Sequence, residues 1–384
     1  MDVQLPVSGS QIWQILELEN TTFASKAHAV ACDSEGKIYV AGQTSVSPDD
    51  DGATRLTIRK YPQEGKDAEW TRHIPQNGDL PLGLSVARGI AIDSTGIIYV
   101  VGELDLEDDG GHLWIGKFSS DGLLIADYTD SLAFTRGRAI VIDPTDDNKI
   151  YIVGFTEKLN SESGFVAAFD SNLKASKWIE VVDDPTIANN RLFGVTMNSD
   201  QDLLISGAYR PGVKKVRALV LKYTAKGAQI WWRAAKSPPE VKDIAFDIDI
   251  TKDGEIIGIG RQKGNGFEEA LWTFRLDKDG DEFVSSVDTG ALCGIDGCSV
   301  TIDASGNHVF AGASAKFKGA SADTLLRKLS PGWLEQLWSK SLDGFDGSQD
   351  RSLAVAIDPD GFVYGVGFET KDMKPRWWVG KFNP

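Results

Sequence analysis

Short stretches of alternating apolar and polar residues, separated by polar turns, run through the whole chain. Residues 93–102 read DSTGIIYVVG, in which a polar turn leads into apolar residues and ends on a glycine. The same pattern stands at 33–42 as DSEGKIYVAG. Alternation of this kind, rich in β-branched and aromatic residues between Asp- and Gly-rich turns, predicts β-strands joined in hairpins. No stretch has a sustained helical apolar repeat, so we expect few helices.

The strand pattern recurs seven times at a nearly fixed spacing. Each copy ends on a glycine, and successive glycines lie 52 to 60 residues apart. These glycines are Gly42, Gly102, Gly154, Gly207, Gly260, Gly312 and Gly367. Such a period is too long for helical solenoid repeats and is typical of four-stranded propeller blades.

Each unit continues with a third strand, such as HLWIGKF at 112–118, and usually with a fourth strand that carries a tryptophan. The last unit ends at the chain terminus after its third strand, whereas SGSQIWQIL at 8–16 resembles a fourth strand. We therefore predict that this N-terminal strand completes the last blade and closes the ring, which leaves no sheet edge unpaired.

The expected fold is all-β: one seven-bladed β-propeller domain over residues 1–384, with four antiparallel strands per blade and the N-terminal strand closing the last one. The expected blades are 26–75, 84–130, 134–182, 189–234, 241–286, 293–341, and 349–384 together with 8–16.

These repeats resemble the bacterial SBBP-type β-propeller repeat family. The resemblance rests on the strand ARGIAID at 87–93, the turn and strand that follow it, and the later LWIGKF. It covers essentially the whole chain and departs locally: Gln201 stands where the fourth unit should have its turn glycine, and the fifth unit reads AFDIDIT at 245–251. The resemblance implies a propeller, often in exported or cell-surface proteins. It implies no reaction, because propellers host unrelated functions.

The chain is acidic, with 56 Asp and Glu residues against 40 Lys and Arg, a formal charge of −16. Nucleic acid and anionic membranes are therefore poor partners. No apolar run reaches the roughly 18 residues of a membrane span. The N-terminus lacks the charged and apolar regions of a signal peptide, which leaves a cytosolic protein or an exported one without its leader; the family resemblance favours the exported one. We expect a monomer without a cofactor.

Three cysteines leave the compartment open. Cys32 occupies an apolar strand position, where a buried thiol is the usual interpretation. Cys293 and Cys298 lie in CGIDGC and could form a disulfide across a short loop, which would indicate an oxidising compartment. Only two thiols lie near one another, and the four histidines (His28, His73, His112 and His308) are spread over three units, so we expect no metal site.

The starts of the innermost strands should converge on the ring axis. Matched positions there are His28, Arg88, Arg138, Phe193, Phe246, Cys298 and Leu353. Two residues earlier in each unit stand Lys26, Val86, Arg136, Arg191, Ile244, Asp296 and Arg351. Arginine forks suit carboxylate and phosphate ligands. We predict a ligand-binding group at the channel mouth made of Arg88, Arg136, Arg138, Arg191, Arg351, Asp296 and His28. The alternative is that each arginine pairs with a carboxylate or carbonyl of a neighbouring blade.

The longer loops should share the face that holds this channel mouth, and their charges differ from unit to unit. Those of the first three units contain Asp49, Asp50, Asp51, Glu103, Asp105, Glu107, Asp108, Asp109 and Glu157. Those of the last four contain Arg210, Lys214, Lys215, Arg217, Arg261, Lys263, Lys316, Lys318, Lys371, Lys374 and Arg376. This pattern predicts either ordinary solvated charge or a dipolar face that orients a partner.

Asp247 and Asp249 replace small residues of the fifth inner strand and point to the same side of it. Two interpretations remain open: hydrogen bonds that clasp an adjacent blade, or an acid–base pair working with nearby arginines or His28. The acidic turn DKDGDEF at 277–283 is more typical of a hairpin than of a calcium loop, because it lacks the glycine that a calcium-binding loop has at its sixth position.

Motifs for common chemistries are missing: the chain has no GxSxG, HExxH or P-loop. Its 11 tryptophans fall mostly in third and fourth strands, where packing between blades explains them better than sugar stacking. We expect a non-catalytic binding or scaffold propeller for a protein or a small anionic ligand. The alternatives are a channel-mouth lyase or hydrolase using Asp247 and Asp249, and a carbohydrate-binding propeller.

Overall fold

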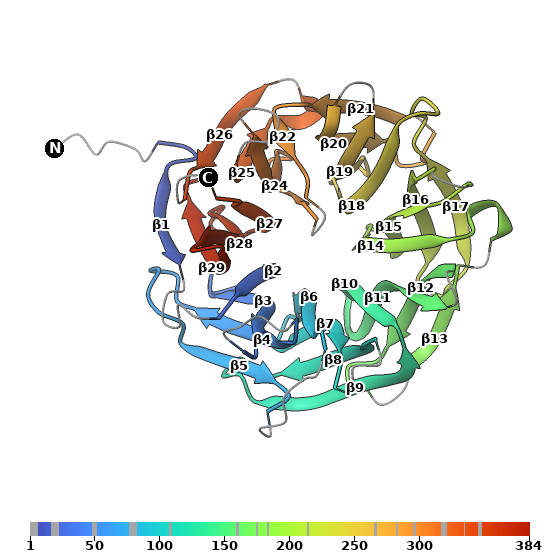
Figure 1. The fold of residues 1–384 in the computed structure, drawn as a ribbon. Helices are drawn as coiled ribbons and strands as arrows, with labels where there is room; N and C mark the ends of the chain where they lie inside the picture. The colour runs from blue at the N-terminus through green and yellow to red at the C-terminus, as the bar shows by residue number, and fades with distance from the viewer. Residues whose placement is uncertain are drawn as a thin grey trace.

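Seven antiparallel β-sheets surround a central axis in the computed structural model (Figure 1). The described residues contain two short 3-10 helices, η1 (Pro185–Ile187) and η2 (Pro331–Trp333), and none of their helices has the length and apolar character needed to cross a membrane. The structure describes residues 7–16, 23–47, 52–76, 83–106, 110–158, 161–173, 176–182, 184–212, 215–264, 267–281, 283–294, 297–315, 321–333, 335–344 and 348–384.

Blades 1 to 4 each consist of four consecutive strands, ordered from the axis outward. These strands are β2 (Ser25–Cys32), β3 (Ile38–Ser45), β4 (Thr54–Tyr61) and β5 (Trp70–Ile74); β6 (Val86–Ile92), β7 (Ile98–Leu104), β8 (His112–Phe118) and β9 (Leu124–Ala133); β10 (Thr135–Asp143), β11 (Asp146–Lys158), β12 (Ser161–Phe169) and β13 (Ser176–Val181); β14 (Asn190–Met197), β15 (Asp202–Tyr209), β16 (Arg217–Thr224) and β17 (Gln229–Ala234).

Blades 5 to 7 follow the same plan with two variations: the sixth has a divided inner strand, and the seventh takes its outer strand from the N-terminus. Their strands are β18 (Lys242–Ile250), β19 (Ile256–Gly264), β20 (Phe267–Leu276) and β21 (Phe283–Asp288); β22 (Ala291–Leu292) and β23 (Ser299–Ile302) with β24 (His308–Ala315), β25 (Ala322–Leu329) and β26 (Gln336–Leu342); β27 (Arg351–Ile357), β28 (Val363–Lys371), β29 (Lys374–Phe382) and β1 (Gln11–Leu16).

Ring closure by the N-terminal strand is confirmed. Strand β1 pairs antiparallel with β29, so that Trp13 lies opposite Lys381. Backbone hydrogen bonds extend the junction: the Gly9 amide donates to the Asn383 carbonyl at 3.1 Å, and the Asn383 amide donates to the Ser10 carbonyl at 2.9 Å. The first and last segments of the chain therefore build one sheet.

The Asp-x-x-Gly turns have the predicted form. The Asp33 carboxylate accepts hydrogen bonds from the Glu35 and Lys37 amides, each at 2.9 Å, and Gly36 has a φ of +73°. In the fourth unit Gln201 occupies the glycine position with a φ of +64°. A side chain in this left-handed region costs about 1 kcal/mol, so the turn geometry is kept even where the sequence does not favour it.

The core lies between blades, and the outer-strand tryptophans belong to it. Trp13 covers Gly65 of blade 1, where a Cβ would lie 2.3 Å from the indole, and its Nε1 donates to the Gln63 carbonyl at 3.1 Å. Trp70 covers Gly122 of blade 2 in the same way. Each indole therefore rests on the turn of the next blade, which is a packing role.

Replacing Trp13 with alanine should destabilise the whole ring, because the side chain holds the closing strand against blade 1. We expect a loss of about 2–4 kcal/mol in the free energy of unfolding, measured by urea denaturation. The control is Ile12→Ala on the same strand, since Ile12 is 45% exposed. Equal urea midpoints for the two variants would contradict a closing role for Trp13.

Candidate functional site

An irregularity in the innermost strands places one side chain per blade in the central channel. In six blades the register of the inner strand shifts by one residue at the same position. A β-bulge of this kind leaves the extra residue unpaired and re-aims its side chain. The residues at these shifts are His28, Arg88, Arg138, Phe193, Phe246 and Leu353. Together with Cys298 of the divided strand, all of them line one cavity.

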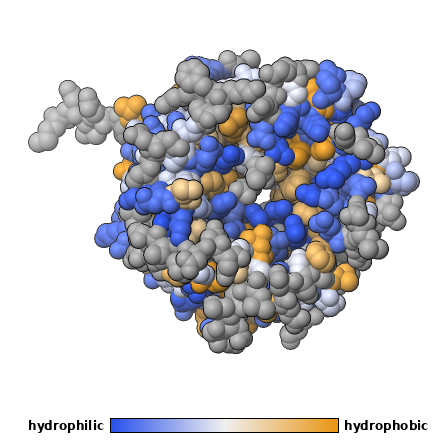
Figure 2. Space-filling view, in the orientation of Figure 1, coloured by the Kyte–Doolittle hydropathy of each residue, from blue (hydrophilic) through white to orange (hydrophobic). Residues whose placement is uncertain are grey.

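This cavity has a volume of about 560 Å³ and lies on the ring axis. The space-filling view shows the opening at the centre of the ring, bordered by hydrophilic and hydrophobic side chains (Figure 2). The volume is within the range of small-molecule sites. The matched positions predicted from the sequence are thus brought together; their role in binding stays a prediction.

A buried carboxylate links two of the predicted arginines. Glu103, only 3% exposed, lies 3.4 Å from an Arg88 amino nitrogen and 3.1 Å from Arg136 Nε. Arg88 also donates to His28 Nδ1 at 3.3 Å, and His28 Nε2 contacts the Gln43 side-chain oxygen at 3.1 Å. This arrangement suits a neutral imidazole with its proton on Nε2.

A second buried carboxylate pairs with the next arginine around the ring. The Glu162 carboxylate forms an ion pair with the Arg191 guanidinium and lies 3.7 Å from an amino nitrogen of Arg210. Arg136 and Arg191 thus pair with a carboxylate of a neighbouring blade, as the alternative from the sequence describes, whereas Arg88 pairs with Glu103 of its own blade.

Phe155 forms a common platform for three guanidinium groups. The guanidinium carbons of Arg191, Arg138 and Arg136 lie 4.9, 5.2 and 5.8 Å from its ring centroid. Cation–π attraction of this kind is worth about 0.5–2 kcal/mol per contact and offsets part of the repulsion between the like charges. Phe155 is fully buried, so it supports the arginines from beneath.

Arg138 differs from the other three arginines. Among the described residues it makes no hydrogen bond or ion pair, and its contacts are the rings of Phe155 and Phe193. Burial and the neighbouring Arg88 guanidinium lower the pKa of Arg138 to about 9. The Glu103 carboxylate opposes this decrease, and the Arg138 side chain is still charged near neutral pH. It therefore brings into the channel a positive charge that makes no direct ion pair among the described residues.

Two other predicted ligand residues stand apart from this group. Arg351 does not line the cavity; it packs against Gly294 of blade 6, where a Cβ would meet its guanidinium. Arg136 is not among the lining residues either, so a shared ligand site that includes Arg136 and Arg351 stays a prediction. Asp296 lies outside the described residues.

Sequence reasoning missed the layer of residues behind the channel. The residue after each unit glycine lies next to the start of the inner strand, as in the pairing of Arg136 with Phe155. Glu103 follows Gly102 and pairs with Val86 in the same way. A count one residue past each glycine would have identified these supporting residues.

Asp247 and Asp249 have the contacts of a clasp. Asp247 accepts hydrogen bonds from the Ser299 hydroxyl at 2.8 Å and the Val300 amide at 3.0 Å, both in blade 6. Asp249 accepts from the Ile302 amide at 3.0 Å. Their other oxygens accept from the backbone amides of the residues that follow them. Burial raises the pKa of Asp247 to about 6 and that of Asp249 to about 7.

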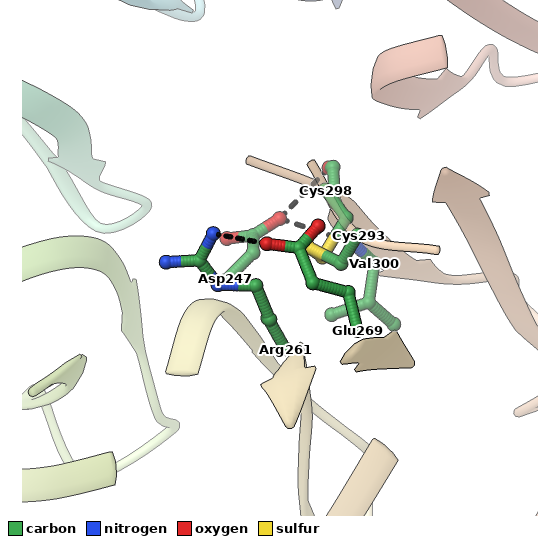
Figure 3. The surroundings of a disulfide bond; sticks show 7 residues. Asp247, Arg261, Glu269, Cys293, Cys298 and Val300 are labelled. Carbon is green, nitrogen blue, oxygen red and sulfur yellow. Dashed lines mark hydrogen bonds and ion pairs between the residues drawn. A yellow bond between two sulfur atoms is a disulfide. The ribbon is translucent and has the colours of Figure 1, made fainter. Parts of the chain in front are cut away.

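Figure 3 shows Asp247, which accepts a hydrogen bond from the Val300 amide, next to the Cys293–Cys298 disulfide. The sixth inner strand is interrupted between Leu292 and Ser299, which differs from the regular strand expected from the repeat. The disulfide joins the two sides of this break, and Asp247 holds the strand that follows it. Nearby, Arg261 contacts Glu269 at 3.0 Å and lies over Phe246.

Several charges of the predicted dipolar face are buried or paired. Glu103 and Asp105 are buried, and Arg217 contacts Asp243 at 3.3 Å. Nine other charges of this face lie outside the described residues: Asp49, Asp50, Asp51, Glu107, Asp108, Asp109, Lys214, Lys316 and Lys318.

The acidic turn at 277–283 has the contacts of a hairpin turn, because the Asp277 carboxylate accepts a hydrogen bond from the Asp281 amide at 2.8 Å.

No protein-family model and no curated protein matches this chain. The resemblance to SBBP-type repeats therefore stays a prediction from the sequence.

Solved structures share the fold at low identity. A protein of unknown function from Dyadobacter fermentans aligns with a TM-score of 0.62 at 12% identity, covering 98% of this chain and 99% of that one. The polysaccharide lyase Uly1 aligns with a TM-score of 0.56 at 10% identity, covering 92% and 89%. A Trypanosoma rangeli sialidase in complex with sialic acid aligns with a TM-score of 0.52 at 12% identity, covering 92% of this chain and 60% of the sialidase. These likenesses show a propeller fold.

The buried aspartates predict a pH-dependent stability. Their folded pKa values lie above the ordinary value of about 4, so the folded state binds more protons between about pH 4 and 7. This contribution to stability is therefore lost as the pH rises through that window. We measure the free energy of unfolding in urea for Asp249→Asn and for the wild type. The difference between them should shift in favour of the variant by on the order of 1–3 kcal/mol as the pH rises from 5 to 8. Asp281→Asn, in an exposed turn, is the control; a pH-independent difference for Asp249→Asn would contradict the assignment.

The disulfide determines how many free cysteine thiols the unreduced protein should have. Unfolded without reductant, the protein should show one titratable thiol, that of Cys32, because Cys293 and Cys298 are bonded. Reduction should lower the free energy of unfolding by about 2 kcal/mol, as expected for a short closed loop. Three thiols in the unreduced protein would show that the bridge does not form.

Proposed function

We propose that this propeller is a non-catalytic binding module that holds a small organic anion at the mouth of its central channel. The observation that carries the proposal is Arg138, which lines the cavity and makes no hydrogen bond or ion pair among the described residues. Charged groups in such surroundings are normally paired, and an anionic ligand would supply the partner.

Other arginines near Arg138 make this part of the channel more positive. Five guanidinium groups gather here around two buried carboxylates, although the whole protein has a charge of −16. The five are Arg88, Arg136, Arg138, Arg191 and Arg210. Low-dielectric walls strengthen the attraction of this surplus for an anion. Planar guanidinium forks suit a carboxylate best, because they bind it through two parallel hydrogen bonds.

A binding role is favoured over the channel-mouth enzyme because of the two aspartates. Each oxygen of Asp247 and Asp249 accepts a backbone amide, and Asp247 takes a further bond from Ser299. A carboxylate committed in this way is poorly placed to move protons to and from a substrate.

Carbohydrate acids are the second candidate class of ligand. Polysaccharide lyase and sialidase structures share the fold, and the sialidase is bound to sialic acid, a sugar that carries a carboxylate. At this identity the likeness supports the fold alone, so acidic sugars enter as members of a ligand panel. The disulfide supports our proposal that the protein functions in an oxidising compartment, as an exported protein would.

Titration calorimetry tests the proposal with acetate, benzoate, phosphate and glucuronate at constant ionic strength. At least one carboxylate should bind, and Arg138→Gln should weaken it by tenfold or more, since a charge-assisted pair is lost. The control is Lys278→Gln, an exposed cation in the turn between β20 and β21, which removes the same charge away from the channel. Binding that persists unchanged in an Arg138→Ala/Arg191→Ala double variant, or no binding at all, would overturn the proposal.

A further inference from the structure

The seven side chains at the matched inner positions divide into two contiguous sectors. Blades 1 to 3 contribute His28, Arg88 and Arg138, whereas blades 4 to 7 contribute Phe193, Phe246, Cys298 and Leu353. At these seven positions the side chains are therefore polar or basic in one sector and apolar in the other, although Arg191, Asp247, Asp249 and Arg261 of blades 4 and 5 also line the cavity. The repeat does not require this division, because six of the seven blades present their residue through the same register shift.

The apolar sector begins where the arginines end. The ring centroids of Phe193 and Phe246 lie 5.2 Å apart, and Phe193 also contacts the Arg138 guanidinium at 5.8 Å. Both phenylalanines line the cavity and are half-buried. Cys298 is bonded to Cys293, so its sulfur offers an apolar surface rather than a reactive thiol. An apolar pair, Phe193 and Phe246, thus stands beside the Arg138 guanidinium, with Arg261 on the other side of Phe246.

Apolar side chains line this open cavity, and a ligand that covers them removes apolar surface from water, which makes the free energy of binding more favourable. Inorganic phosphate or acetate would satisfy Arg138 and leave Phe193 and Phe246 uncovered. A carboxylate attached to a ring or a short hydrocarbon chain would satisfy both sectors. The volume of about 560 Å³ has room for such a molecule.

We infer that the ligand is an amphiphilic monocarboxylate whose acid group meets Arg138 and whose apolar body lies against Phe193 and Phe246. This inference rests on the proposed function and adds the requirement for an apolar body. Covering roughly 60 Å² of apolar surface corresponds to about a tenfold gain in affinity, so the body should be visible in the dissociation constant.

The experiment compares acetate, hexanoate, benzoate and glucuronate by titration calorimetry of the full chain. We expect hexanoate or benzoate to bind at least tenfold more tightly than acetate and glucuronate. Phe246→Ser should remove this preference for hexanoate or benzoate over acetate, whereas Phe246→Leu should retain most of it. Phe362→Ser, in the turn before β28 and outside the cavity, is the matched control.

The outcomes separate the inference from the proposed function. Equal affinities for all monocarboxylates, reduced together by Arg138→Gln, would overturn the apolar requirement and leave anion binding intact. Tightest binding of glucuronate would also overturn it, in favour of a sugar acid. No binding of any anion would overturn both. The comparison of ligands in the wild-type protein decides these cases even if a phenylalanine variant does not fold.

Discussion

Pairing of the first strand with the last is the constraint on which the rest of this structure depends. Every inner strand contributes residues to the channel, and those of Arg138 and Phe246 meet in one cavity only because seven blades close into a ring. The Trp13 contact and the β1–β29 ladder satisfy the outer edge of the last blade. Without them the sheet would end in an unpaired strand, and nothing would hold the channel at a fixed diameter.

Local charge in the channel runs opposite to the charge of the whole protein. Glu103 and Glu162 are buried between arginines, so part of the acidic excess is used to hold a basic cluster together. Phe155 contributes by lying beneath three guanidinium groups. The result is a group of cations in which Arg138 makes no hydrogen bond or ion pair among the described residues, and we propose that an external anion supplies its partner.

Much of the fold could be predicted from the sequence, because Gly42 and its six counterparts mark backbone positions that recur in every blade. The same count located the channel side chains, since the register shift occurs at a fixed distance from each glycine. The partners of the arginines could not be predicted. Which carboxylate Arg191 contacts depends on side-chain packing across strands, and the same holds for the contact of Arg351 with Gly294.

The most direct test of this account is anomalous diffraction from crystals soaked with 4-bromobenzoate. The account predicts a bromine peak inside the channel near Phe193 and Phe246, with the carboxylate facing Arg138. An empty channel in crystals that bind the molecule elsewhere, or a carboxylate turned away from Arg138, would contradict it.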